Sequence, residues 1–436
     1  MKRAKILASA FTCCPAATPG FSGGEDTLGW NLVQQIGQHH EVWVITQEED
    51  RESIENTVGA QGLTGVHFHY VGLPSWLNPM LKFQGAHQVY YYLWQMRAYF
   101  AARALHKQHR FNLFHHITYA NDWMASFIGA LLPIPYVRGP GGGAHRTPAS
   151  LIGEYTFKGR IWERIRRMGQ WMFRHDPFFI LGHRRASAIL LCNNDAMSIM
   201  PPKWSGKLHL YPVSGVPLED LALGDEATPA NDDGLTNAEF SVISAGSLIR
   251  VKGFGLAIRA FKKFSDKYPD SKLTIIGSGP EEPYLAELVR SSHLEDQVEL
   301  PGASPRNDLL KKMASSDVLL FPSLRDGGGT VVIEAMSVGK PVVCLDIGGP
   351  GMHITEECGI KITPSSPEET VEELAGALEL LYTDRELRSR LGKAAREKAA
   401  QSYTWERLGD RLMEIYEPIL EVHATGDRLS DQSTQP

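Results

Sequence analysis

The sequence has few cysteines, no long hydrophobic run and no excess of basic charge. Five Cys in 436 residues, with no CxxC pair, exclude a disulfide framework and favour a reducing, cytoplasmic compartment. No uncharged apolar stretch approaches the ~20 residues that a membrane-spanning helix needs. Lys and Arg number 44 against 50 Asp and Glu, a net charge of −6, whereas a dedicated nucleic-acid binder would be basic. We therefore expect no nucleic-acid partner.

The N-terminus has one ambiguous feature. Lys2, Arg3 and Lys5 precede a short apolar run, as in a signal peptide. The alternative is a first β-strand over residues 5–9. We favour the strand, because the run is short and leads into a loop with Pro and Gly.

Short apolar runs alternate with helical patterns along most of the chain. Runs that are apolar at consecutive positions are typical of parallel strands buried on both faces. Helices between them predict βαβ units, and therefore an α/β fold with two doubly wound, Rossmann-like domains facing each other across a cleft. The expected strands are 41–46, 66–71, 112–117, 187–192 and 208–213 in the first domain, and 240–245, 272–277, 297–300, 317–322 and 341–345 in the second.

The domain boundaries follow from composition. Residues 221–239 lack apolar periodicity and are rich in Asp, Gly, Pro and Asn, so they predict a linker between domains 1–220 and 240–402. An amphipathic helix is expected over 403–422, and it could pack back on the first domain. The polar tail 423–436 is expected to be disordered.

The strongest local pattern is SLRDGGGTVVIEAMSVGKPVVCLDIGGP, residues 323–350. Its three glycines follow a strand expected to end at Phe321 and precede a helix from Thr330 to about Val338. Glycine N–H groups at a helix N-terminus favour a phosphate. Asp326 and Glu334 flank that position, and ionised carboxylates accept hydrogen bonds from hydroxyls. The pattern predicts a nucleotide-sugar site; the alternative is an ordinary glycine turn with a solvated Asp.

These residues resemble the retaining glycosyltransferases of family 4 (glycosyltransferase group 1), which have the GT-B architecture. The family signature is two acids separated by seven residues and followed by EAMxxGxPVV, which here is Asp326, Glu334 and the residues up to 343. Further segments match in the same order along the chain. They are CPAATPGFSGGEDTLGWNLVQQI (14–36), FHHITYANDW (114–123), VRGPGGGAHRTP (137–148), AGSLIRVKGFGLAIRAF (245–261) and IIGSGPEEPYLAEL (275–288).

The resemblance implies a role for each matched residue. Glu334 would bind the ribose hydroxyls, Asp326 would contact the transferred sugar, and Lys252 would neutralise the leaving diphosphate. His116, rather than His115, would contact the donor sugar or the acceptor; the alternative is a strand-end histidine satisfied by hydrogen bonds. The remaining donor-binding residues would be Gly23 and Gly24 of the opposite domain, with Gly327, Gly328, Gly329 and Thr330. Neither a protein-bound metal nor a cofactor is expected.

The sequence departs from the family pattern at two positions. The first signature acid is usually Glu and is Asp326 here, one methylene shorter. The family's Arg five residues before the lysine is Ser247, so one cation is missing from the phosphate site. Arg250 and Arg325 lie in the same loops and are candidates to replace it.

A further segment, 158–175, carries six Lys and Arg, one acid and seven apolar residues at helical spacing. It could contact an anionic membrane surface or a lipid-linked acceptor, making the protein peripheral at the inner face of a membrane. It could instead be a helix packed on the first domain with an arginine-rich outer face, and we prefer this second interpretation.

The predicted function is therefore transfer of a hexose, with retention, from a nucleoside diphosphate-sugar to a hydroxyl acceptor. By resemblance, the acceptor would be a carbohydrate, a lipid-linked molecule or a small molecule, in polysaccharide or glycolipid assembly. The alternatives are a nucleotide-sugar epimerase or a phosphorylase on the same fold, or a non-catalytic nucleotide-sugar-binding protein.

Overall fold

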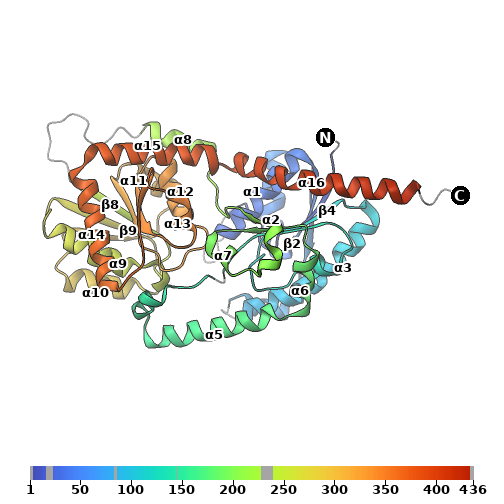
Figure 1. The fold of residues 1–436 in the computed structure, drawn as a ribbon, viewed down its shortest axis with the longest axis horizontal. Helices are drawn as coiled ribbons and strands as arrows, with labels where there is room; N and C mark the ends of the chain where they lie inside the picture. Colours follow the sequence, from blue (N-terminus) through green and yellow to red (C-terminus); the bar gives the residue numbers. More distant parts are fainter. Residues whose placement is uncertain (1–2, 16–22, 83–85, 144, 227–238, 433–436) are drawn as a thin grey trace. The chain divides into compact units, whose positions relative to one another are not determined.

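The computed structural model describes residues 3–15, 23–82, 86–143, 145–226 and 239–432 (Figure 1). The chain forms two compact units. The first comprises residues 1–144, 165–213 and 405–436, and the second comprises 145–164 and 214–404. Both contain a parallel sheet with helices, so the predicted α/β fold with two doubly wound domains is confirmed.

The first unit contains a seven-stranded parallel sheet with strand order β3-β2-β1-β4-β5-β6-β7. Its strands are β1 (Lys5–Ser9), β2 (Glu41–Gln47), β3 (Val66–Val71), β4 (Leu113–His116), β5 (Tyr136–Gly141), β6 (Ala188–Leu191) and β7 (Leu208–Leu210). Its helices are α1 (Gly23–His39), α2 (Arg51–Gln61), α3 (Ala86–His109), α4 (Phe127–Leu131), α6 (Pro177–Arg185), α7 (Asn194–Ser198) and α16 (Trp405–Gln432). Helix α5 (Phe157–Arg174) is divided between the units, and short 3₁₀ helices occupy Glu48–Asp50, Ser75–Lys82 and Pro202–Lys207.

The second unit contains a six-stranded parallel sheet with order β10-β9-β8-β11-β12-β13. Its strands are β8 (Phe240–Ala245), β9 (Ser271–Ile276), β10 (Val298–Gly302), β11 (Val318–Phe321), β12 (Val342–Leu345) and β13 (Gly359–Ile362). Its helices are α8 (Leu218–Glu226), α9 (Phe254–Ser265), α10 (Glu282–Ser291), α11 (Arg306–Ala314), α12 (Thr330–Ser337), α13 (Gly348–His353), α14 (Pro367–Thr383) and α15 (Arg385–Ser402). The 3₁₀ helices of this unit are Ala149–Glu154 and Arg250–Lys252.

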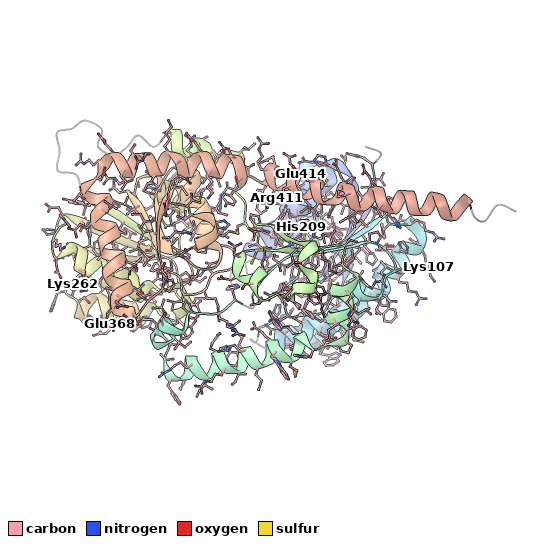
Figure 2. All side chains as sticks on the ribbon, in the orientation of Figure 1. Lys107, His209, Lys262, Glu368, Arg411 and Glu414 are labelled. Atoms are coloured by element: carbon pink, nitrogen blue, oxygen red, sulfur yellow. The ribbon has the colours of Figure 1, made fainter. Side chains whose placement is uncertain are left out.

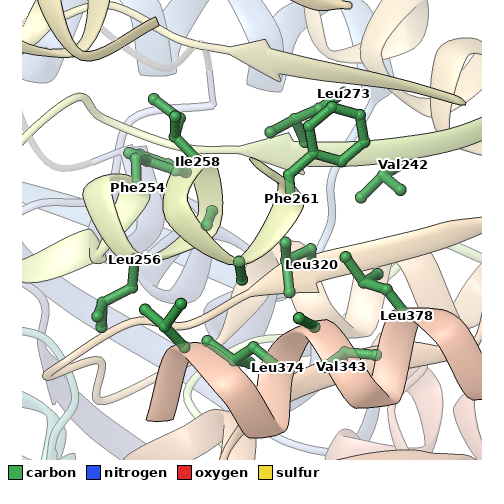
Figure 3. Close-up of a cluster of buried hydrophobic side chains, with 14 of the residues drawn as sticks. Val242, Phe254, Leu256, Ile258, Phe261, Leu273, Leu320, Val343, Leu374 and Leu378 are labelled. Carbon is green, nitrogen blue, oxygen red and sulfur yellow. The ribbon is translucent and has the colours of Figure 1, made fainter. Parts of the chain in front are cut away.

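Each sheet is buried on both faces, which explains the continuous apolar runs. In the inner strand β1, Ile6 and Ala8 belong to one hydrophobic cluster and Leu7 to another, as alternation along a strand requires. Figure 3 shows one core of the second unit, where α9 and α14 pack together against the sheet. Its labelled side chains include Phe261, Leu320 and Leu374.

The structure corrects the strand prediction at two places. Strands β5 (Tyr136–Gly141) and β13 (Gly359–Ile362) were not among the predicted strands. All six residues of β5 are buried between parallel neighbours β4 and β6, and this pairing outweighs the low strand propensity of glycine and proline.

The observed units also differ from the predicted boundaries. Residues 145–164 belong to the second unit, because Leu151 and Tyr155 pack in its core. Residues 221–226 of the expected linker are the end of α8, and residues 227–238 lie outside the described residues.

Helix α16 packs on α1 in the first unit, and Figure 1 shows the two helices side by side. Trp405, Leu408 and Tyr416 join the core there, and Arg411 (labelled in Figure 2) donates to the carbonyl oxygen of Leu210 at 2.6 Å. The helix continues to Gln432, so residues 423–432 of the expected disordered tail are helical; residues 433–436 lie outside the described residues. Extending an existing helix needs no new nucleation, which favours this continuation.

Among the helices that the structure describes, none is both long and apolar enough to cross a lipid bilayer.

Candidate functional site

The signature residues lie at the carboxyl edge of the second sheet. β8 pairs with β9 on one side and β11 on the other, so the chain connections reverse direction between β8 and β11. Open parallel sheets bind ligands at such a switch point, beyond the strand ends. The segments after these two strands, 246–253 and 322–329, carry Lys252 and Asp326 respectively.

The glycine loop is positioned by two close backbone approaches. Gly329 has φ +61° and precedes α12, which starts at Thr330 as predicted. A Cβ on Gly348 would lie 2.2 Å from the carbonyl oxygen of Asp326, and the N–H of Gly349 donates to that oxygen at 2.9 Å. Only glycine allows the loop after β12 to approach this closely.

His353 on α13 also fixes this loop. Its Nε2–H donates to the carbonyl oxygen of Gly328 at 2.7 Å. Burial lowers the pKa of His353 to about 4, so the imidazole is neutral at physiological pH. Sequence reasoning missed this residue, since its place beside the loop depends on how α13 folds back.

Asp326 and Lys252 form an ion pair at the loop. Asp326 Oδ1 also accepts from the N–H groups of Gly328 and Gly329, at 3.1 and 2.9 Å. Burial acts to raise the pKa of Asp326, but Lys252 and these N–H donors outweigh it and hold the pKa below its usual value. Asp326 is therefore ionised at neutral pH, and its side chain is 12% exposed.

Lys252 reaches Asp326 because the loops after β8 and β11 are joined through their backbones. The N–H of Leu324 donates to the carbonyl oxygen of Val251 at 2.8 Å. A Cβ on Gly253, which has φ +72°, would lie 2.0 Å from the carbonyl oxygen of Pro322. The position directly after Lys252 therefore requires a glycine.

Glu334 lies one turn inside α12 and is paired with Arg306, the first residue of α11. The Arg306 Nε donates to Glu334 Oε1 at 2.8 Å, and its two terminal nitrogens donate to Asp220 Oδ1 and Oδ2 at 3.2 and 2.5 Å. Burial raises the pKa of Glu334 above its usual value, and Arg306 opposes that rise. Sequence reasoning missed Arg306 and Asp220. The one available signal was the position of Arg306 just after a strand.

The candidate replacements for the missing cation are paired with acids. Arg250 Nε lies 2.8 Å from Glu281 Oε2, and its guanidinium stacks over the Tyr284 ring at 4.2 Å. Arg325 donates to Glu163 of α5 at 2.7 Å. Ser247 is exposed in the same loop.

Thr330 also has a partner in the second unit. Its hydroxyl lies 2.6 Å from the Ser214 hydroxyl. The first turn of α12 is therefore attached to the segment that precedes α8.

The remaining predicted residues belong to the first unit. His116 ends β4 and is buried, with Nε2 2.9 Å from the Tyr91 hydroxyl and Nδ1 2.8 Å from the Ser126 hydroxyl. His115 bonds Tyr416 and the Gly139 carbonyl oxygen, both at 2.6 Å. Burial lowers the pKa of both histidines, that of His115 to about 4. These contacts match the alternative of hydrogen-bonded structural histidines, and a sugar contact for His116 stays a prediction.

Gly23 and Gly24 open helix α1, next to residues 16–22, which lie outside the described residues. A Cβ on Gly24 would have no atom within 4 Å. Glu25 follows them, and its carboxylate accepts from the backbone N–H of Tyr119 at 3.1 Å. Their contact with a donor stays a prediction.

The arrangement in the second unit combines three chemical capacities. A lysine and the N-terminus of α12 can attract phosphate oxygens, an ionised Asp can accept hydrogen bonds from sugar hydroxyls, and a fixed Glu can accept them from a ribose. Asp326, Lys252, Gly328 and Gly329 meet directly, and Glu334 lies further along the same helix.

Known proteins are similar to this chain in sequence and in fold. Residues 230–398 match the family model described as glycosyl transferases group 1. A D-inositol 3-phosphate glycosyltransferase of Kribbella flavida is 28% identical over 219 residues, 48% of this chain and 51% of that protein. An uncharacterised glycosyltransferase of Methanocaldococcus jannaschii is 28% identical over 190 residues, 43% of this chain and 47% of its own. The chain thus spans about half the length of the curated relatives it matches.

Solved structures extend the similarity in fold. HepE of Anabaena, solved in complex with UDP, superposes with a TM-score of 0.61 at 16% identity, covering 95% of this chain and all of that one. A sucrose-phosphate synthase of Thermosynechococcus elongatus gives 0.64 at 18% identity, over 96% and 100% of the two chains. At 16% and 18% sequence identity, this structural similarity is evidence for a shared fold only. The family match covers residues 230–398 and includes the signature segment with Asp326 and Glu334.

Proposed function

We propose that this chain transfers a hexose, with retention of anomeric configuration, from a nucleoside diphosphate-sugar to a hydroxyl acceptor. The observation that carries the proposal is the Lys252–Asp326 ion pair, which joins the loop after β8 to the glycine loop at the N-terminus of α12. Three features meet at this place and would serve sugar transfer: the cation of Lys252, the ionised Asp326 and the N-terminus of α12.

The chemistry of the leaving group explains the cation. Breaking the bond between the sugar and its phosphate leaves negative charge on the diphosphate, and Lys252 with the helix N-terminus would stabilise that charge. The ionised Asp326 would stabilise the positive charge that develops at the anomeric carbon. The leaving phosphate would act as base toward the acceptor hydroxyl on the same face of the sugar. Positive charge then comes from Lys252, and the proposal includes no protein-bound metal.

Glu334 would supply the nucleoside contact. A carboxylate that Arg306 holds through one oxygen keeps a second oxygen with which to accept bonds from the ribose hydroxyls. Because the similar Anabaena protein was solved with UDP, a UDP-sugar is the first donor to test.

The acceptor would be a carbohydrate, a lipid-linked molecule or a small hydroxyl compound, and the setting polysaccharide or glycolipid assembly. A lipid-linked acceptor would require contact with a membrane, and α5 is the candidate surface for it.

The test measures nucleotide binding and sugar transfer separately. Titration calorimetry with UDP, GDP and ADP should show binding to one of them, weakened at least tenfold by Glu334→Ala and by Lys252→Ala. A matched control is Glu372→Ala, which removes a 63% exposed carboxylate of the same unit and should leave binding unchanged. NMR of the product should show the donor's anomeric configuration, and EDTA should not reduce the rate.

The alternatives give different results. An epimerase would convert the donor without an acceptor, and a phosphorylase would depend on inorganic phosphate. A non-catalytic binding protein, which Ser247 in place of Arg would suit, would bind nucleotide and never release sugar. Unchanged binding in both the Glu334 and the Lys252 variants would refute the proposed site.

A further inference from the structure

Helix α5 exposes apolar side chains along its length. The apolar residues with more than a third of their surface exposed are Phe157 (70%), Ile161 (42%), Trp162 (47%), Ile165 (48%), Met168 (67%), Trp171 (65%) and Met172 (58%). The preferred sequence interpretation was a helix packed on the first domain with an arginine-rich outer face; in the structure, apolar side chains share that outer face with the arginines. A contiguous exposed apolar surface of this kind usually marks an interaction site.

Several polar side chains of α5 contact the rest of the protein. Glu163 is buried and accepts from Arg325, within the second unit. Gln170 and Arg174 donate to the carbonyl oxygens of Gly143 and Asp122, at 3.0 and 3.2 Å, within the first unit. Because polar contacts attach the helix on one side, its apolar residues are left on the other.

Helix α3 carries a second exposed apolar row. Its members follow one another at spacings of four, three and four residues, which places them on one side of the helix. They are Val89 (48%), Leu93 (36%), Met96 (45%) and Phe100 (64%). Within the first unit the two helices are neighbours, since the rings of Tyr92 and Phe173 lie 6.3 Å apart and Tyr92 donates to Asp176 at 2.6 Å.

The charge around these two rows is positive. Helix α5 carries six Lys and Arg, and its single acid, Glu163, is neutralised by Arg325. No Asp or Glu occurs between Glu55 and Asp122, a stretch that contains all of α3 with Arg97, Arg103 and Lys107. The whole chain has a net charge of −6, so these segments oppose the charge of the rest.

We propose that the exposed rows of α3 and α5 dock on the surface of an anionic lipid bilayer. Trp, Met and Ile side chains insert at the boundary between headgroups and acyl chains, and flanking Arg and Lys bind lipid phosphates. A second copy of this chain fits less well, because a symmetric contact would bring identical cationic surfaces together. The proposal concerns surfaces outside the donor site and does not depend on the transferase activity.

The experiment is sedimentation of the full chain with vesicles. Vesicles that contain phosphatidylglycerol should bind it at least about tenfold more tightly than pure phosphatidylcholine vesicles, and added NaCl should weaken the binding. Tryptophan fluorescence should shift to the blue on binding, because the indoles of Trp162 and Trp171 leave water.

Two variants separate the apolar and the electrostatic contributions. Trp162→Ser with Trp171→Ser should reduce vesicle binding at least about tenfold, and Arg164→Gln with Arg167→Gln should reduce the preference for anionic lipid. The control, Leu380→Ser with Val422→Ser, removes two exposed apolar side chains elsewhere and should bind like the unaltered chain. Because all of these side chains are exposed, each variant should keep the melting temperature of the unaltered chain. Measuring that temperature verifies that each variant is folded.

Three results would overturn the proposal. They are equal binding to anionic and neutral vesicles, unchanged binding by the Trp162/Trp171 variant, or a concentration-dependent dimer in light scattering that this variant abolishes. The last would identify a second copy as the occupant. Nucleotide binding, measured on the same samples, is expected to be unaffected, so failure here leaves the proposed transferase untouched and the reverse also holds.

Discussion

Arg306→Met tests whether one guanidinium stabilises two buried acids of the candidate site. The side chains of Glu334 and Asp220 are 10% and 5% exposed, and Arg306 itself is 42% exposed. Met retains most of the aliphatic length and removes the charge and the donors. The variant therefore leaves two buried carboxylates without the cation that now faces both of them.

The loss in the free energy of unfolding caused by Arg306→Met lies between two limits. Breaking a fully buried ion pair costs about 3–5 kcal/mol, whereas an exposed pair contributes roughly 0–1 kcal/mol. Because the acids are buried but Arg306 is partly solvated, we expect a loss of about 2–3 kcal/mol in the free energy of unfolding. For a unit of this size that corresponds to a fall of roughly 5–10 °C in the melting temperature.

The way in which the stability of Arg306→Met changes with pH follows from the pKa of Glu334. Burial already raises the pKa of Glu334, and Arg306 opposes it, so the variant should have a folded-state pKa still further above the unfolded value. Between those two values the folded state binds a proton that the unfolded state lacks. Because the unfolded-state pKa is common to both proteins, the stability of the variant relative to the unaltered protein should fall as pH rises from the folded-state pKa of Glu334 in the unaltered protein to its higher value in the variant, and then level off.

Thermal unfolding followed by circular dichroism across that pH range is the assay. Arg290→Met is the matched control, since it removes a 64% exposed arginine paired with Glu287 and should cost less than about 1 kcal/mol. A melting temperature within a degree or so of the unaltered protein, or a loss that does not change with pH, would refute the reasoning.

Three further predictions concern side chains that hold the loops and helices in place. Gly329→Ala should destabilise the second unit by about 1–2 kcal/mol, measured by urea unfolding, because it would place a Cβ at φ +61°. His353→Ala should weaken nucleotide binding by releasing the loop at Gly328, and His353→Gln, which keeps an N–H donor, should restore it in calorimetry. Tyr416→Phe should cost about 1–3 kcal/mol in thermal unfolding, because it leaves the buried Nδ1 of His115 without its 2.6 Å partner.

The variant His353→Gln is the control for His353→Ala, and the Gly329 and Tyr416 variants have controls of their own. Gly376→Ala lies in a helix with open space around its Cβ and should not destabilise, and Tyr284→Phe removes a phenol that is 39% exposed and should be nearly neutral. A stable Gly329→Ala protein, tight nucleotide binding by His353→Ala, or an unchanged melting temperature for Tyr416→Phe would each contradict the corresponding prediction.

Periodic local patterns made much of the fold predictable. The first strand falls at Lys5–Ser9 and helix α12 starts at Thr330, both as expected from sequence. Strand β5 was missed because its Gly-Pro-Gly residues have turn propensity, and parallel neighbours on both sides outweighed it. The helical residues 221–226 were missed because they begin a stretch, 221–239, without apolar periodicity, and residues 423–432 because their composition is polar.

The sequence by itself determined the two doubly wound sheets and the loop with Asp326 and Glu334, because burial of parallel strands and a glycine turn before a helix both leave short-range patterns. Only the tertiary structure decided which cation each acid meets, as with Lys252 for Asp326 and Arg306 for Glu334, and which side of α5 is exposed. Those outcomes depend on contacts between residues far apart in the chain. Local periodicity carries no information about which partners they will find.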